Sequence, residues 1–346
     1  MTVLFSRNGR TMGKSAIVAG VLGASLFFGV SSAQADVFIE AVIRGAQPAP
    51  GADVVALCPD LTERPQVYTS RGEDSLASRL ARAGKRVFLV DPWSATATAS
   101  SGFDGAVTEV LPALLSELSM RASGGEIYWI GHGICGLLPM AAAARGNEDA
   151  AAIHWIALGT RFDWTRPSGP LRSWLQAWAE DEDPVPAATQ RVLFTGLREA
   201  VGPRASSVPP ALRTDTNRSA AEELETFHRN KLLRAPAKVV LEDLIRWFSA
   251  GTISASTGWI DYSVGLEKMT GDALLVAGMT DPWAPPESAL PAPAAAGSAR
   301  LEVKVVGRSE GAKEDYGHLG MLLSENASAD IDRVVLHWLN SHRSRR

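Results

Sequence analysis

Apolar residues recur with two different periods along the first half of the chain. Compact apolar runs that end at Pro, Asp or Gly, as buried strands do, occur at 53–58, 86–90, 126–130 and 153–158. Between them, apolar residues repeat at helical spacing at 74–83, 103–120 and 137–145. Because strands and helices alternate, the pattern predicts an α/β fold with a doubly wound, mainly parallel sheet and helices on both faces.

The pattern changes at residue 160. Residues 160–265 contain prolines, charge clusters and five of the ten tryptophans, which predicts a mostly helical insertion. Beyond it, strands are predicted at 272–278 and 301–306 and a final helix at 330–340. We therefore expect a core in two parts, 36–159 and 266–346, with residues 160–265 as a helical cap between them. The tryptophans of this cap form either its own small core or an acyl-binding groove.

The first 35 residues have the organisation of a secretory signal peptide. Three basic residues precede an apolar run at 15–30, and Ala33-Gln34-Ala35 gives a small-residue cleavage site. We therefore predict an exported protein, periplasmic or secreted. An uncleaved anchor is the alternative, but the run is short for a membrane span. No other stretch is apolar enough to span a membrane, so no transmembrane segment is expected after signal removal.

Composition narrows the class of partner. Hydrophobic residues make up 46% of the chain and charged residues 21%, which is ordinary for a protein with a packed core. The formal net charge is -4 and no strongly basic segment stands out, so nucleic acid is not expected as a partner. The sequence suggests no cofactor and no metal site. It has two cysteines, Cys58 and Cys135, which an exported protein can oxidise.

The most informative stretch is 126–136, where a strand, a tight turn and a helix follow one another with glycines at the turn. This layout is typical of a nucleophile elbow. The turning residue of an elbow has a strained backbone, and its neighbours must be small because other strands lie close. The helix at 137–145 would direct its N-terminus towards a developing anion.

On these residues the chain resembles the α/β-hydrolase fold superfamily, in particular its bacterial lipase-like and polyhydroxyalkanoate-synthase-like branch. In that branch the elbow usually reads Gly-His-Ser-x-Gly-Gly. Residues 131–136 here read Gly-His-Gly-Ile-Cys-Gly, so Gly133 stands at the position of the nucleophilic serine. Glycine has no side chain that could attack a carbonyl, and the nucleophile position is therefore vacant.

The same resemblance implies the rest of a catalytic triad. The segment 274–282 resembles the family's acid loop, in which Asp281 matches the triad acid. The motif Tyr-Gly-His-Leu at 316–319 resembles the histidine motif, in which His318 matches the base. Elbow, acid and histidine follow in the order that this fold uses. The resemblance covers roughly residues 50–342, and it implies that His132 beside the turn has a structural role.

The loop after the first strong strand also departs from the family pattern. Relatives have His-Gly or Pro-Gly there, and a backbone amide of this loop helps to form the oxyanion hole. Here the loop reads Cys58-Pro59-Asp60-Leu61, so the oxyanion region would consist of Leu61, Ile134 and the carboxylate of Asp60. A carboxylate near the developing negative charge raises the barrier. Ordinary serine-hydrolase chemistry is therefore not expected.

The two cysteines allow three interpretations. In this fold the strand that ends at Cys58 lies beside the strand that ends at Gly131, so Cys58 and Cys135 can form a disulfide if their Cα atoms lie about 4.4–6.8 Å apart. They can also be two buried, inert thiols. In the third, Cys135 is a nucleophile activated at a helix N-terminus, although it lies two residues past the turn.

These residues lead to two main hypotheses. In the first, the protein is an exported pseudoenzyme of the esterase and lipase class, which binds an apolar or acyl-type small molecule, or a protein partner, without turnover. In the second, it is an active ester or lipid hydrolase or an acyltransferase, in which His318 and Asp281 activate water or in which Cys135 attacks. A scaffold role for the cap surface is a third hypothesis.

Overall fold

The computed structural model describes residues 26–32, 35–42, 48–165, 232, 234, 236–297 and 300–342, with backbone alone for 26–42. Within these residues no helix combines the length and the apolar character that crossing a membrane requires. Most of the predicted signal peptide, 1–35, and most of the predicted cap lie outside the described residues, and both stay predictions.

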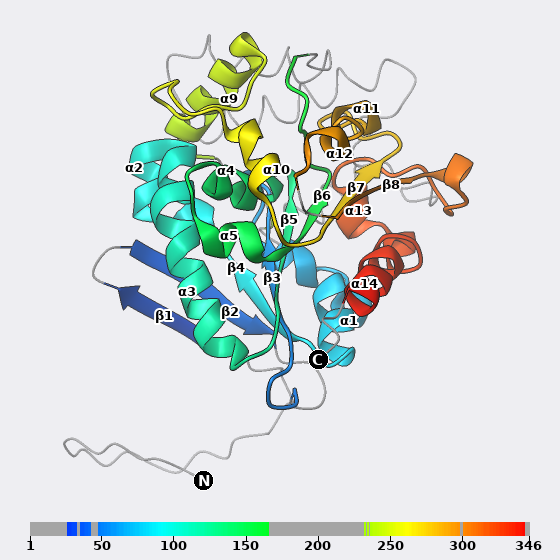
Figure 1. The fold of residues 1–346 in the computed structure, drawn as a ribbon. Helices are drawn as coiled ribbons and strands as arrows, with labels where there is room; N and C mark the ends of the chain where they lie inside the picture. Colours follow the sequence, from blue (N-terminus) through cyan, green and yellow to red (C-terminus); the bar gives the residue numbers. More distant parts are fainter. Residues whose placement is uncertain are drawn as a thin grey trace, which may run out of the picture.

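An eight-stranded sheet forms the centre of the described structure, in the spatial order β1-β2-β4-β3-β5-β6-β7-β8 (Figure 1). The strands are β1 (Leu26–Ser32), β2 (Ala35–Val42), β3 (Val54–Cys58), β4 (Arg86–Val90), β5 (Ile127–His132), β6 (His154–Leu158), β7 (Ala273–Gly278) and β8 (Leu301–Val306). The six strands from β4 to β8 are parallel, whereas β1 and β2 join the sheet as an antiparallel pair. The predicted fold class, a doubly wound and mainly parallel sheet, is confirmed.

Side chains of each central strand alternate between two hydrophobic cores. On β3, Val54, Ala56 and Cys58 belong to one core cluster, and Val55 and Leu57 belong to the other. All five are fully buried. Because both faces of a parallel sheet are covered by helices, its strands are continuous apolar runs rather than alternating ones.

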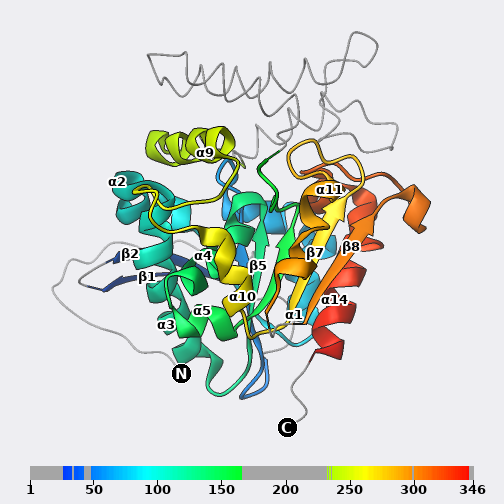
Figure 2. The same cartoon turned by 45° about the horizontal axis from the view of Figure 1, so that its top comes forward.

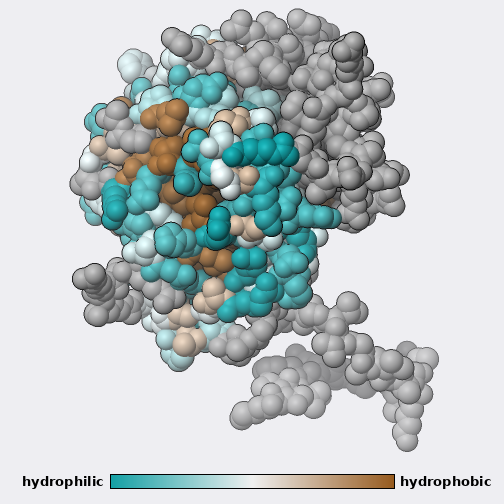
Figure 3. All heavy atoms as spheres, turned by 90° about the vertical axis from the view of Figure 1, so that its right-hand side faces the viewer, coloured by the Kyte–Doolittle hydropathy of each residue, from teal (hydrophilic) through white to brown (hydrophobic). Residues whose placement is uncertain are grey.

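Helices cover both faces of this sheet (Figures 1 and 2). They are α1 (Leu76–Arg82), α2 (Thr96–Gly105), α3 (Leu111–Ala122), α4 (Leu138–Ala144), α5 (Glu148–Ala152), α9 (Lys238–Ala250), α10 (Gly265–Lys268), α11 (Pro286–Ala289), α12 (Ala292–Ala295), α13 (Gly320–Leu323) and α14 (Ile331–Ser341). Residues of α2, α3, α4 and α9 form the first core with one face of the sheet, and residues of α1 and α14 form the second core with the other face. At the open edge, β8 is mostly half-buried, and Figure 3 shows a band of apolar residues among polar ones on this side of the molecule.

The predicted helix at 103–120 is helical throughout in the structure, with a kink just before it and a π-helical turn within it. Gly102 has a positive φ of 64°, and a π-helical segment, Ala106–Val110, separates α2 from α3. At the kink, Asp243 of α9 accepts a hydrogen bond of 2.8 Å from the backbone N–H of Phe103, and a Cβ at residue 102 would collide with this carboxylate. A contact between segments so distant in sequence leaves no periodic signal.

The described part of the cap region contains the helix α9, as expected for a mostly helical insertion. Trp164 and Trp247 are buried and pack edge to face, with ring centroids 5.4 Å apart. Trp259 is 90% exposed. Two of these three tryptophans therefore belong to a core, whereas Trp174 and Trp178 lie outside the described residues.

Candidate active site

The turn after β5 has the geometry that the elbow motif predicts. Gly133 follows the strand with a φ of +55°, in the left-handed region that favours glycine. Gly131 must also be small, because a Cβ there would lie 2.6 Å from the carbonyl oxygen of Cys135. On the far side, the hydroxyl of Thr160 donates a hydrogen bond of 2.9 Å to the Gly133 carbonyl. The strand, the turn and α4 are therefore held in the arrangement of a nucleophile elbow.

The carboxylate of Asp60 fills the space beside Gly133. A Cβ built on Gly133 would lie under 3.0 Å from all three carboxyl atoms of Asp60, closer than real Cβ atoms approach their neighbours. A serine at residue 133 and the present position of Asp60 are therefore incompatible. The glycine provides the room that the carboxylate occupies.

The same carboxylate holds the amide expected to stabilise an oxyanion. The Ile134 N–H donates a hydrogen bond of 2.8 Å to Asp60 Oδ1. Asp60 is fixed in turn, because its own N–H donates to Glu63 Oε2 at 3.0 Å. Leu61 follows on the same loop, and its carbonyl accepts from Arg234 Nε at 3.3 Å. The oxyanion region is thus occupied by a negative group of the protein itself.

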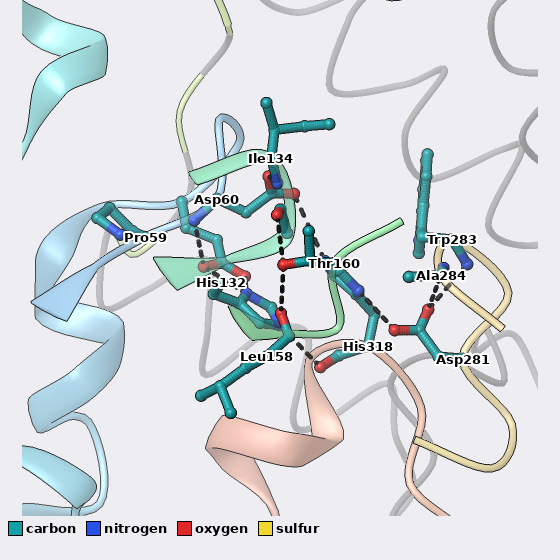
Figure 4. A network of polar contacts seen from close by, with 12 residues as sticks. Pro59, Asp60, His132, Ile134, Leu158, Thr160, Asp281, Trp283, Ala284 and His318 are labelled. Carbon is teal, nitrogen blue, oxygen red and sulfur yellow. Dashed lines mark hydrogen bonds and ion pairs between the residues drawn. The ribbon is translucent and has the colours of Figure 1, made fainter. Parts of the chain in front are cut away.

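His318 lies between two carboxylates (Figure 4). Its Nδ1 is 2.8 Å from Asp281 Oδ2, and its Nε2 is 3.5 Å from Asp60 Oδ2. Asp281 lies just after β7, where its Oδ1 accepts from the backbone N–H groups of Trp283 and Ala284 at 2.8 and 3.1 Å. The structure therefore joins residues from three separate strand ends into one array, Asp60–His318–Asp281.

The two carboxylates of this array raise the pKa of the histidine. Burial opposes the charge of His318 and lowers its pKa, but Asp281 and Asp60 outweigh burial and raise the pKa well above its ordinary value of 6.5. For Asp60, burial raises the pKa, but the bond to His318 and the charges of His318 and His132 outweigh it, so the pKa is below 3.8. Both shifts favour the charged forms of His318 and Asp60.

The influence of Asp60 on the pKa of His318 gives a testable prediction. Asp60→Asn removes one of the two negative charges beside His318, so the pKa of His318 is expected to fall while its bond to Asp281 remains. NMR titration of the ring nitrogens measures this pKa. Asp149→Asn, at an exposed position in the first turn of α5, is the matched control and should leave it unchanged. A His318 titration that is identical in Asp60→Asn and in the unmodified protein would show that the two groups do not interact.

The two shifted groups also define a pH range of greatest stability. His318, whose pKa is raised, contributes stability that is complete below pH 6.5 and is lost as the pH rises through its folded pKa. Asp60, whose pKa is lowered, contributes stability that is complete above pH 3.8 and is lost as the pH falls through its folded pKa. Both contributions are therefore complete between pH 3.8 and 6.5. Urea unfolding inside and above this range should show the alkaline loss, and Asp60→Asn should reduce it.

His132 and Glu63 form a second buried pair beneath the array. His132 Nδ1 is 3.0 Å from Glu63 Oε2, and its Nε2 is 3.2 Å from the His318 carbonyl. Both side chains are fully buried. Glu63, His132 and His318 also offer ligand atoms within 4.8 Å of one another, close enough together to hold a metal ion. The predicted structural role of His132 fits these contacts.

Cys58 and Cys135 are joined as a disulfide, with Cα atoms 6.0 Å apart. The register of the sheet explains their proximity, because Cys58 lies opposite Gly131 on the neighbouring strands β3 and β5. The hypothesis of Cys135 as nucleophile is not supported, since it is fully buried and has no free thiol in this structure. The bond connects the loop that bears Asp60 to the elbow.

Three residues of the site were missed by sequence reasoning. Glu63 anchors the Asp60 amide and His132, and Thr160 binds the elbow carbonyl. Gly159, with a φ of +53°, leaves room for the histidine and its acid, since a Cβ there would lie 3.0 Å from atoms of both. Only Glu63 left a signal, because it stands three residues after Asp60, the spacing at which a side chain can reach back to a backbone N–H.

The chain resembles solved proteins in structure, but the sequence comparisons found no match. No protein-family model matches the chain, and no curated protein matches it by sequence. A 2-hydroxy-6-oxo-6-phenylhexa-2,4-dienoate hydrolase from Rhodococcus sp. strain RHA1 has a TM-score of 0.58 at 13% identity, over 92% of this chain and 98% of that one. A thermophilic esterase from Thermogutta terrifontis has a TM-score of 0.55 at 16% identity, over 93% and 100%.

A membrane phospholipase A, described as a bacterial virulence factor, has a TM-score of 0.57 at 10% identity, over 92% of this chain and 87% of its own. The chain has the α/β-hydrolase fold. At these identities the likeness concerns the fold alone, and the activities named belong to those proteins. Within the α/β-hydrolase fold the elbow is the place of the nucleophile, so the carboxylate of Asp60 lies where the reactive group of such an enzyme is expected.

Proposed function

We propose that this α/β-hydrolase-fold protein is exported, is not a serine hydrolase, and binds an apolar or acyl-type small molecule beside the elbow without forming an acyl-serine intermediate. The observation that carries this proposal is the position of Asp60, whose carboxylate occupies the space of the missing serine side chain and accepts the Ile134 N–H. A serine hydrolase needs both places free.

Three requirements of a serine hydrolase are not met at this site: a nucleophile, a free oxyanion donor and an unprotonated base. No hydroxyl is present there to attack. A negative group already occupies the oxyanion amide, and one such donor is worth about 10²–10³ in rate. The two carboxylate neighbours of His318 raise its pKa and favour its protonated form, which cannot accept a proton as a base. Each loss alone would impair hydrolysis of an ester, and here they occur together.

Apolar side chains beside the array support the class of ligand. Ile134 is buried at the elbow, and the half-buried ring of Trp283 lies 6.4 Å from the His318 ring between centroids. Figure 4 shows Ile134 next to Asp60 and Trp283 near Asp281, at the two ends of the array. The negative charge of Asp60 disfavours an anionic ligand, so an uncharged ester or alkyl compound fits better than a free fatty acid. A protein partner stays a prediction, for which the described residues offer no specific support.

A binding experiment tests this proposal. Calorimetry with methyl decanoate should show saturable binding, and decanoate should bind more weakly because of Asp60. Trp283→Ala is expected to weaken the binding roughly tenfold or more, since an aromatic side chain supplies a large apolar contact. Trp259→Ala, at a 90% exposed position, is the matched control. The proposal fails if methyl decanoate does not bind, or if the protein rapidly turns over p-nitrophenyl esters.

A further inference from the structure

We propose that β8, the strand at the open edge of the sheet, pairs with β8 of a second copy of this chain, antiparallel and centred on Val303. Among the described residues the sheet ends at β8, with β7 as its one neighbouring strand (Figure 1). Two strands, β6 and β7, separate β8 from the strand that bears the elbow. The pairing therefore concerns a different surface from the candidate active site and does not depend on the proposed function.

The outward-facing backbone groups of β8 belong to its odd-numbered residues. The carbonyls of Arg300 and Val306 accept hydrogen bonds of 2.9 and 3.0 Å from the first residue of β7 and from the residue just after its end. Because backbone direction alternates along a strand, the even-numbered residues of β8 bond to β7 throughout. The N–H and C=O groups that point away from β7, where another strand could bond to them, are those of Leu301, Val303 and Val305.

A two-fold axis at Val303 matches these directions. Two copies of one strand that are related by such an axis run antiparallel, and Val303 lies opposite its own copy. Leu301 then lies opposite Val305 of the partner subunit. Each outward-facing residue of β8 therefore exchanges hydrogen bonds with an outward-facing residue of the other copy, as a regular antiparallel ladder requires.

The charges on β8 select this register. Glu302 lies opposite Lys304 of the partner subunit, and the two-fold axis repeats this contact. These residues form non-hydrogen-bonded pairs, in which side chains approach most closely, so opposite charges there stabilise the pairing. A slide of two residues keeps the outward-facing groups opposite one another, but it places Glu302 against Glu302 or Lys304 against Lys304. Like charges directly opposite each other destabilise such a pair.

Both charged side chains are accessible to a second chain. Lys304 is exposed, and the side chain of Glu302 is 42% exposed. The carboxylate of Glu302 is held in position, because its Oε1 lies 3.4 Å from His342 Nε2 and 3.3 Å from Arg300 Nε. A lysine on an edge strand usually prevents pairing with other chains. Lys304 has this effect on an unrelated strand, whereas a copy of β8 offers it a carboxylate.

The other face of β8 is apolar. Leu301 and Val303 are half-buried and pack against the first core, and an apolar band lies on this side of the molecule (Figure 3). Across the two-fold axis the apolar side chains of one copy would meet those of the other. The sequence Leu-Glu-Val-Lys-Val at 301–305 thus complements itself in charge on one face and in apolar character on the other.

Charge reversal tests the proposal. Sedimentation equilibrium of the purified protein should show a dimer at about 100 µM. Glu302→Lys and Lys304→Glu should each raise the dissociation constant about tenfold or more, because each turns two attractive contacts into two repulsive ones. An equimolar mixture of the two variants should recover the affinity, since one offers two lysines and the other two glutamates. Glu242→Lys on α9, where the side chain is 58% exposed, is the matched control.

Three results of this experiment would overturn the pairing. The first is a monomer at about 100 µM in the unmodified protein. The second is a dimer that neither substitution weakens. The third is a mixture of the two variants that associates no better than either variant alone.

A cysteine at the two-fold axis reports the register directly. Val303→Cys should form a covalent dimer under mild oxidation, because the Cα atoms of a hydrogen-bonded pair lie about 5.5 Å apart, within the reach of a disulfide. Lys304→Cys should not, since its two copies lie diagonally, about 7–8 Å apart. The two native cysteines are bonded to each other and do not compete. Equal cross-linking of both variants, or none of Val303→Cys, overturns the proposal.

Discussion

The combined variant Asp60→Ala/Gly133→Ser is expected to hydrolyse short p-nitrophenyl esters, whereas neither single variant should do so. Gly133→Ser alone places its Cβ against the carboxyl group of Asp60, so the serine cannot take the position of a nucleophile. Asp60→Ala alone frees the Ile134 N–H but supplies no hydroxyl. Together the changes restore a serine, a free oxyanion donor, and a histidine held by Asp281 alone.

The size of the gain can be bounded from its parts. A positioned base contributes about 10²–10⁴ in rate, and one oxyanion donor contributes about 10²–10³. Serine in the left-handed conformation of residue 133 costs about 1–2 kcal/mol of stability. The folded double variant should therefore exceed the background rate by at least about 100-fold.

A further change identifies the source of that activity. Adding His318→Ala to the double variant should return the rate to background, because the serine then has no base. If Gly133→Ser alone were as active as the double variant, Asp60 would not occupy the space assigned to it. The strongly non-additive outcome that we expect is the sign of two residues that compete for one place.

Reduction of the disulfide is expected to lower the free energy of unfolding by about 4 kcal/mol. Cys58 and Cys135 are 77 residues apart, and loop-closure entropy gives this magnitude for a loop of that length. Urea unfolding with and without dithiothreitol measures the difference. The variant Cys58→Ala/Cys135→Ala is the control, since its midpoint should not respond to the reductant. Two free thiols in protein unfolded without reductant would contradict the bond.

The strands were the most predictable elements because each is a short apolar run closed by a turn residue. β3, β4 and β8 lie within or at the predicted boundaries. The helices were less predictable where another segment packs against them. At the kink at Gly102, Asp243 of α9 contacts the backbone of the next residue, and the short helices α5 and α10 have too few residues to show a period.

For the site, sequence reasoning identified the residues but not their arrangement. Gly133, Asp281 and His318 were recognised because each lies in a local motif. Asp60 was recognised as a disturbance of the oxyanion region, but its place at the elbow follows from the pairing of β3 with β5 and from the direction of one side chain. Neither is encoded in a local pattern.

Removal of the predicted signal peptide would change the antiparallel pair of strands at the end of the sheet. β1 pairs with β2 from Leu26↔Ala41 to Ser32↔Ala35, and the predicted cleavage site ends at Ala35, the first residue of β2. Cleavage there would remove the whole of β1 and would leave the backbone N–H and C=O groups along one side of β2 without the partners that β1 provides. An unpaired edge strand can pair with a strand from another chain. Removal of β1 would therefore expose β2 as an edge at which a second chain could add a strand.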